Sequence, residues 1–213
     1  MAKTPYLRDK DEEIVNALLH AVGFGLSLAG TASLAYSCID KSMLHWVAAM
    51  SFMLTLNFTY AMSAVYHGTL EPGKKRRRRM YDHLSIYTAI GGGWSPVFLL
   101  CMSDPSGSYA YIAMWAAVLL GSLYKIYNLG KHELVSLIGY LVMGWAGFYP
   151  IATGLAVLPD GAGMWLLAGG FFYTFGSYFY FRDYKPYFHS VWHIMVMLGS
   201  ICHFISLKAY IIG

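Results

Sequence analysis

The sequence contains few charged residues. Asp, Glu, Lys and Arg together make up 12% of its 213 residues, whereas an ordinary soluble domain carries about 25%. Hydrophobic residues make up 57%. This composition excludes an ordinary water-soluble domain, and we expect an integral membrane protein.

Cysteine is also scarce. The three cysteines, Cys38, Cys101 and Cys202, show no C-x-x-C spacing, which argues against a cysteine metal site or a redox pair. We interpret them as packing residues. Cys38 and Cys101 both fall near the predicted outer face, so a disulfide between them is the alternative. The residues before the first apolar block lack the net positive charge of a secretory signal, and we expect that block to be a retained helix.

Seven apolar blocks of about 20 residues are long enough, at a rise of about 1.5 Å per residue, to cross a hydrocarbon core of roughly 30 Å. Lipid cannot satisfy backbone polar groups, so such blocks are helical. We predict an all-α fold, a seven-transmembrane helix bundle in a single domain over residues 1–213, with a short segment 1–13 before the first helix. The predicted spans are 14–37, 44–67, 81–101, 109–129, 133–157, 163–181 and 189–211. Pro96 and Pro150 lie inside two of them, where we expect kinks.

Lys and Arg residues set the predicted orientation. With the N-terminus in the cytoplasm, all of them except Lys41 and Lys208 lie on the inner side, as the positive-inside rule requires. The odd number of helices then puts the C-terminus outside. The basic run at 74–79 is interpreted as a stop-transfer anchor, with binding to anionic lipid headgroups as the alternative. The net charge of +4 therefore reflects topology. We expect membrane lipids as partners, and no nucleic acid.

This topology brings polar side chains from three helices to the cytoplasmic boundary. His67 ends the second predicted span, Asp82 begins the third, and His189 and His193 begin the seventh. Residues four apart lie on one face of a helix, so the last two imidazoles point the same way, and Ser63 is related to His67 by the same spacing. We predict that Zn²⁺ is held by His67, His189 and His193.

Three imidazoles and one water form a tetrahedral catalytic zinc site that keeps one position open. Such zinc lowers the pKa of its water, so that the bound hydroxide can attack a carbonyl. Asp82 would accept a proton or orient the water, and Ser63 would hydrogen-bond the water or the substrate oxygen. These two are the predicted catalytic residues. A carboxylate in lipid is costly, so Asp82 is a functional candidate by default.

Each of these residues also has a structural interpretation. A pair of histidines is tolerated at a membrane interface, Asp82 would serve as a helix N-cap, and Ser63 would be an interhelical packing residue. Their convergence at one depth favours the metal site, because the topology was assigned from Lys and Arg alone. His20 and His203 lie deeper and are expected to be polar packing residues, and an auxiliary role is left open for His83.

Taken together, the motifs Ser63-x-x-x-His67, Tyr81-Asp82-His83 and His189-Ser-Val-Trp-His193, with Asn16-Ala-Leu-Leu-His20, resemble the hemolysin III family. These bacterial inner-membrane proteins are relatives of the progestin and adipoQ receptors (PAQR) and share a superfamily with alkaline ceramidases. The resemblance implies a seven-helix bundle in the inner membrane with a cytoplasmic N-terminus. It implies zinc on the three histidines, with Asp82 and Ser63 beside it.

The sequence thus predicts a zinc-dependent membrane hydrolase that acts on a lipid amide or ester, with ceramide-like substrates as the reference case. A non-catalytic membrane-homeostasis protein or lipid-state sensor, in which zinc only joins helices, is the main alternative. Ion or proton transport is a lesser one, and the haemolytic phenotype in the family name is compatible with more than one of these.

Overall fold

The computed structural model describes residues 9–213, and their regular structure is helical apart from an isolated bridge between Met102 and Ala156. The all-α prediction is confirmed for this part of the chain. The helices are α1 (Lys10–Ser37), α2 (Met43–His67), α3 (Pro72–Leu100), α4 (Ser106–Asn128), α5 (Glu133–Ala146), α6 (Tyr149–Ala152), α7 (Ala162–Phe181) and α8 (Phe188–Ser206), followed by a π-helical turn at Leu207–Ile211. The single turn α6 continues the direction of α5, so these two helices together correspond to the fifth predicted span. Each of the other six predicted spans corresponds to one helix.

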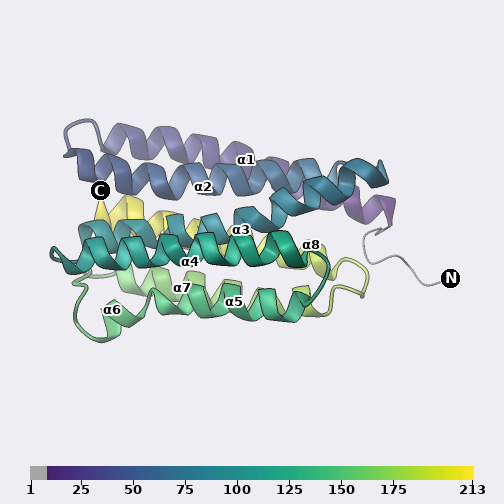
Figure 1. Ribbon diagram of the computed structural model, residues 1–213. Helices are drawn as coiled ribbons and strands as arrows, with labels where there is room; N and C mark the ends of the chain where they lie inside the picture. Colours follow the sequence, from purple (N-terminus) through teal and green to yellow (C-terminus); the bar gives the residue numbers. More distant parts are fainter. Residues whose placement is uncertain (1–8) are drawn as a thin grey trace.

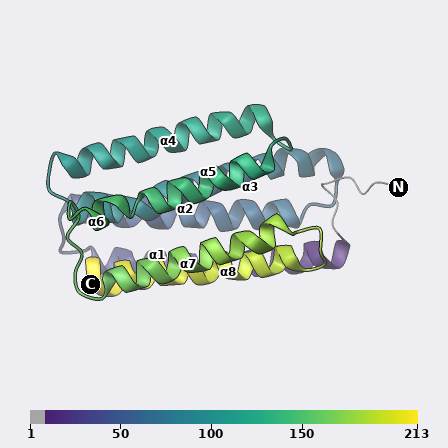
Figure 2. The ribbon, with the colours of Figure 1, turned by 90° about the horizontal axis from the view of Figure 1, so that it is seen from below.

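The helices form a ring in chain order. Each long helix packs against the next one along the chain, α5 packs against α7, and α8 packs back against α1. Figures 1 and 2 show the helices running side by side along the bundle, and α1 begins at the end opposite the C-terminus (Figure 1). The first and last helices are therefore neighbours, which brings residues far apart in sequence to the same end of the molecule.

Five helical segments are long and apolar enough to cross a membrane: Lys10–Ser37, Met43–His67, Ser106–Asn128, Glu133–Ala152 and Phe188–Ile211. Their outward faces carry large apolar side chains, such as Leu18 and Leu120, which are 61% and 67% exposed. Such surfaces are stable in lipid and not in water. The chain is thus a multi-pass membrane protein. Helix α3, which begins with the basic run, and α7 fall outside this group of five.

Two helices begin at least four residues earlier than predicted. Helix α1 begins at Lys10 and not at residue 14, because the Asp9 side chain caps it and acidic residues occupy its first turn. Helix α3 begins at Pro72 and not at residue 81, so the basic run is helical. Lys and Arg are good helix formers, and proline is favoured in a first turn. Asp82 consequently lies well inside α3, and its interpretation as an N-cap is wrong.

Proline acts differently at its two predicted kinks. Helix α3 continues through Pro96. The fifth span is interrupted between Ala146 and Tyr149, just before Pro150. Pro150 lies in the first turn of α6, a position that proline favours because the N–H that it lacks would have no partner within the helix. All three cysteines have free thiols, so the alternative disulfide does not form.

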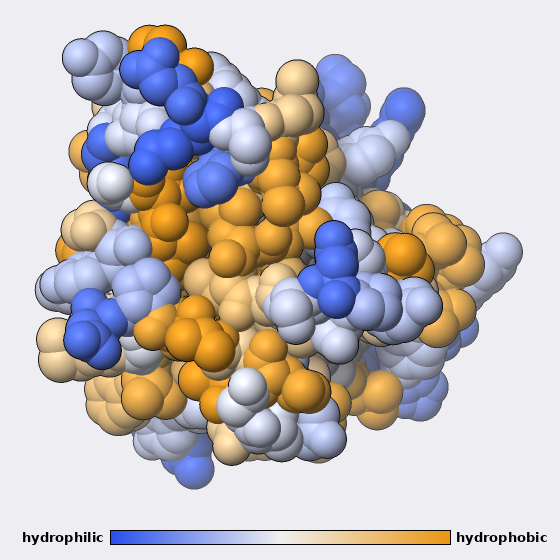
Figure 3. All heavy atoms as spheres, turned by 90° about the vertical axis from the view of Figure 1, so that its left-hand side faces the viewer, coloured by the Kyte–Doolittle hydropathy of each residue, from blue (hydrophilic) through white to orange (hydrophobic). Residues whose placement is uncertain are grey.

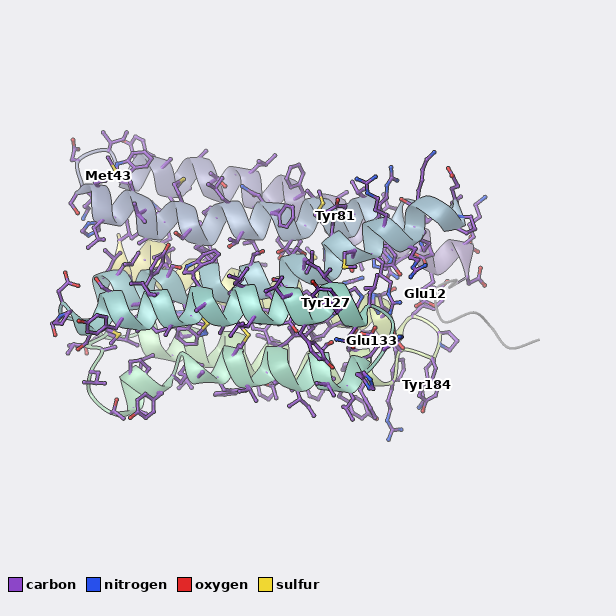
Figure 4. The ribbon with its side chains drawn as sticks, in the orientation of Figure 1. Glu12, Met43, Tyr81, Tyr127, Glu133 and Tyr184 are labelled. Carbon is purple, nitrogen blue, oxygen red and sulfur yellow. The ribbon has the colours of Figure 1, made fainter. Side chains whose placement is uncertain are left out.

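The interior is apolar toward one end and polar toward the other. One hydrophobic cluster includes Leu34, Phe52 and Met53, and a second includes Trp94 and Phe98. These residues lie in the halves of their helices nearest the C-terminal end of the chain, an end that Figure 3 shows face on, with hydrophilic residues around apolar ones. The buried ionisable groups gather at the other end. Figure 4 places Glu12, Glu133 and Tyr184 there and Met43 at the opposite end.

Candidate metal centre

Three buried histidines meet at the polar end of the bundle. His67 is the last residue of α2, and His189 and His193 lie in the first two turns of α8. One ligand nitrogen from each lies within 4.8 Å of the others. His67 is fully buried, and the other two are 7% and 4% exposed. The predicted spacing thus places both α8 imidazoles on one side of α8, toward His67, and the three form a group that could hold a metal ion.

The nitrogen geometry suits a small tetrahedral ion. The Nε2 atoms of His67 and His193 lie 3.1 Å apart, close to the separation of about 3.3 Å expected for two nitrogens at 2.0–2.1 Å from a tetrahedral zinc. The Nδ1 atom of His67 lies 2.8 Å from Oε2 of Glu13. A carboxylate accepts the Nδ1 hydrogen and leaves the Nε2 lone pair directed at the site.

The second histidine also has a carboxylate on its outer nitrogen. Nδ1 of His189 lies 3.5 Å from Oδ2 of Asp183 in the turn between α7 and α8. The rings of His189 and His193 have centroids 4.4 Å apart and nearly perpendicular planes. Carboxylates beside the outer nitrogens of histidines are the usual surroundings of a metal-binding imidazole. The donor set and its surroundings therefore fit a zinc ion.

The two predicted catalytic side chains lie beside the histidines and outside the group of three. Asp82 on α3 is close enough to His67 and Arg79 to interact with them electrostatically. Ser63, one turn before His67, faces Asp82, yet its buried hydroxyl makes no well-formed hydrogen bond among the described residues. Both line the same cavity as His189 and His193. The polar atoms needed to hold a water or a substrate oxygen thus lie next to the metal-binding nitrogens.

The cavity continues from the histidines into the apolar part of the bundle. Its polar end is lined by Asp82, His189 and His193, and further along it is lined by side chains such as Ile90 and Phe148. The lining comes mainly from α2, α3, α5, α7 and α8. A cavity that is polar at one end and apolar beyond has the chemical character of a lipid, which carries a headgroup at one end and a hydrocarbon chain at the other.

The remaining inward-facing histidines do not join the group of three. The His20 ring on α1 packs edge-on against His193, with centroids 4.1 Å apart, and both of its nitrogens are buried without a hydrogen-bond partner. His203 lies deeper, between Trp94 and Tyr173. His83 lines the cavity beside Asp82, and its Nδ1 lies 3.9 Å from Glu133.

The sequence analysis assigned no role to Glu13, and it interpreted Lys75 only as part of the basic run of the stop-transfer anchor. Both are 3% exposed, and Nζ of Lys75 lies 3.0 Å from the Glu13 oxygen that contacts His67. One available signal was the spacing of Glu13, Asn16 and His20, which places three polar residues on one face at the start of an apolar helix. No comparable signal distinguishes Lys75 within a run of six basic residues.

Comparison with known proteins identifies the family of this chain. A family model described as "Haemolysin-III related" matches residues 8–204. The chain is 27% identical to Hemolysin-3 of Bacillus cereus, with 94% of this chain and 92% of that protein covered. It is 30% identical to the Hemolysin-3 homolog of Bacillus subtilis (strain 168), with 93% and 94% covered. It is 25% identical to the human monocyte to macrophage differentiation factor, with 94% and 84% covered. Nearly the whole chain is matched in each case, and it belongs to the hemolysin III family and its wider PAQR group.

Proposed function

We propose that this protein is a zinc-dependent hydrolase of the membrane, which cleaves an amide or an ester bond in a lipid. The observation that carries the proposal is the position of the three histidines. His189 and His193 line the polar end of a cavity that continues among apolar side chains, and His67 lies within reach of both. The carboxylate of Asp82 and the hydroxyl of Ser63 line the same cavity. A lipid seated there would have its polar linkage at the histidines and its hydrocarbon chain beyond.

Zinc supplies the chemistry that such a bond needs, because it polarises a carbonyl oxygen and lowers the pKa of a coordinated water to about 7. His67, His189 and His193 would hold the ion and leave a fourth position open. Hydrolysis adds one water to the bond and releases a fatty acid with an amine or an alcohol. The chain must therefore move a proton from the attacking water to the leaving group.

Asp82 would carry that proton. Its carboxylate lines the cavity and lies outside the group of three ligands, so it remains available as a general base and then as a general acid. Ser63 would donate its hydroxyl hydrogen to the carbonyl oxygen as negative charge develops there.

Substrate would enter sideways from the lipid. Helices α5 and α7, which both line the cavity, pack far less closely against each other than α7 does against α8. On this seam the indole N–H of Trp145 donates to the Thr174 hydroxyl at 3.0 Å, and Trp145 is 43% exposed. The Tyr180 hydroxyl on α7 also donates to a Glu133 carboxylate oxygen on α5, at the long distance of 3.5 Å. Two such hydrogen bonds between loosely packed helices are a weak closure, so this seam is the proposed entrance.

The proposal includes the location of the protein. We propose an inner membrane location, as the family resemblance implies. The distribution of Lys and Arg supports an orientation with the N-terminus in the cytoplasm, and the metal centre would then lie at the cytoplasmic side. Two of the similar proteins carry the name hemolysin. Hydrolysis of membrane lipids would provide one route to haemolysis.

A second role is favoured by one observation. Helix α2 does not pack closely against α8 along the backbone. The histidine group is contributed by these two helices, so a bound ion would join them. A zinc ion could therefore serve only to hold α2 to α8, in a lipid sensor that performs no chemistry. This role predicts that removal of zinc lowers the melting temperature, while the zinc-loaded protein hydrolyses nothing.

The test is hydrolysis by the purified protein in lipid nanodiscs. A panel of lipid amides and esters, with ceramides among them, would be incubated with zinc-loaded, chelator-treated and zinc-reloaded protein, and released fatty acid measured by mass spectrometry. We expect release that disappears with the metal and returns with it. Zinc-loaded protein that releases no fatty acid from any lipid of the panel would contradict the hydrolase and favour the structural role.

A further inference from the structure

The first helix presents one polar face to the metal centre. Glu13, Asn16 and His20 follow one another at intervals of three and four residues and therefore line one side of α1. Each contacts a different part of the centre. Glu13 bonds His67, the Asn16 side-chain oxygen accepts from the Ser190 hydroxyl at 2.6 Å, and the His20 ring packs against His193.

The contact from Glu13 is the most constrained of the three. It joins a carboxylate oxygen to the outer nitrogen of His67 at 2.8 Å, and both side chains are almost completely buried. A neutral imidazole that donates from one nitrogen presents a lone pair on the other. The Glu13 contact therefore fixes both the direction of the His67 ring and the identity of the nitrogen that faces the metal centre.

Glu13 is held in turn by the start of α3. Lys75 lies 3.0 Å from the same carboxylate oxygen, and its ammonium group also donates to the backbone carbonyl of Thr69 at 3.0 Å. That carbonyl belongs to the short link between α2 and α3, directly after His67. Lys75 thus connects the Glu13 carboxylate to the backbone that follows His67. Helices α1, α2 and α3 therefore all contribute to the position of the His67 imidazole.

We propose that Glu13 is a positioning residue of the metal centre, which sets the affinity for zinc by orienting His67, and that Lys75 holds Glu13 in place. The inference rests on the proposed zinc site. It adds a role for α1, which supplies no residue to the group of three histidines. Outer contacts of this kind change metal affinity by about 10- to 100-fold when they are removed.

The experiment measures zinc affinity by chelator competition, and the absorption spectrum of the Co²⁺-loaded protein, in wild type, Glu13→Gln, Lys75→Met and the double variant Glu13→Gln/Lys75→Met. The glutamine has the shape of the glutamate and lacks its charge. Glu13→Gln alone leaves the buried Lys75 without its charged partner, which could prevent folding. The double variant removes both buried charges, so zinc affinity can still be measured in that case. Glu133→Gln is the matched control, because Glu133 is likewise paired with a buried lysine, Lys125, at 2.6 Å, and its other ion-pair partners are Arg79 and His83.

We expect zinc to bind about 10- to 100-fold more weakly to Glu13→Gln and to the double variant, with an altered Co²⁺ spectrum in both. Lys75→Met, which keeps the carboxylate, should lie closer to wild type, and Glu133→Gln should match wild type. If the ion pair only stabilises the fold, Glu13→Gln and Lys75→Met will lower the melting temperature and keep the wild-type zinc affinity and Co²⁺ spectrum, and the inference is overturned. Wild-type affinity in the double variant overturns it as well and leaves the proposed function intact. Absence of zinc binding in wild type overturns both.

Discussion

Replacement of Asp82 by Asn separates catalysis from metal binding. Asn has nearly the same shape as Asp and cannot accept a proton at neutral pH. If Asp82 carries the proton, turnover of the lipid amide or ester should fall by about 100- to 10,000-fold, the range for loss of a general acid or base. This corresponds to about 3–5 kcal/mol of transition-state stabilisation.

Zinc content and thermal stability should not fall in this variant. Because Asp82 lies outside the group of three histidines, we expect the variant to keep one zinc per chain. A charged carboxylate inside a membrane protein costs about 2.5–3.5 kcal/mol on insertion scales. The proximity of Arg79 and His67 offsets part of that cost, so the amide should leave the melting temperature unchanged or raise it.

The assay combines single-turnover release of fatty acid with metal analysis on the same preparation. Asp104→Asn is the control, since Asp104 is exposed and lies in the loop before α4, and it should behave as wild type. The reasoning is refuted if Asp82→Asn hydrolyses lipid at the wild-type rate. It is also refuted if the variant loses its zinc, because Asp82 would then be a ligand or a structural support and not a proton carrier.

Three further predictions concern the bundle. A disulfide formed by Trp145→Cys and Thr174→Cys should block the α5–α7 seam and abolish hydrolysis until a reductant is added, and full activity of the cross-linked protein would exclude this entrance. Gly92→Ala should destabilise the protein by about 1–3 kcal/mol, because a Cβ there would lie 2.5 Å from the carbonyl oxygen of Ser51. Gly25→Ala, which meets nothing within 4 Å, should be neutral or stabilising by up to about 1 kcal/mol, and equal thermal shifts in the two variants would contradict this. Reporter fusions should place the N-terminus in the cytoplasm and the C-terminus outside, and a shared side for both termini would contradict an odd number of spans.

Much of the fold follows from hydropathy, because an apolar run of about 20 residues has few stable structures in lipid other than a helix. The structure departs from the sequence prediction where other interactions dominate. The first turns of α3 carry no apolar signal, yet Lys75 and Arg79 face inward four residues apart. They form ion pairs with Glu13 and Glu133, which come from α1 and α5. Pairing between charges distant in sequence stabilises this extension of the helix, and local periodicity does not reveal it.

The candidate site was likewise predicted only in part from the sequence. The spacing of His189 and His193 predicted that both would face one way, and the Lys and Arg distribution predicted that they would meet His67. The role inferred for Glu13 was not predicted. An acidic residue at the start of a helix is usually a solvated residue that interacts with the helix dipole. Its burial depends on the return of α8 beside α1 and on a lysine supplied by α3.

The central claim is that His67, His189 and His193 form a zinc site, and metal content tests it most directly. Protein purified in detergent without chelators would be analysed by mass spectrometry for its elements, with wild type compared with the triple change of these residues to Ala. One zinc per chain in wild type and none in the folded triple variant is the predicted result. A wild-type protein without bound metal would contradict it.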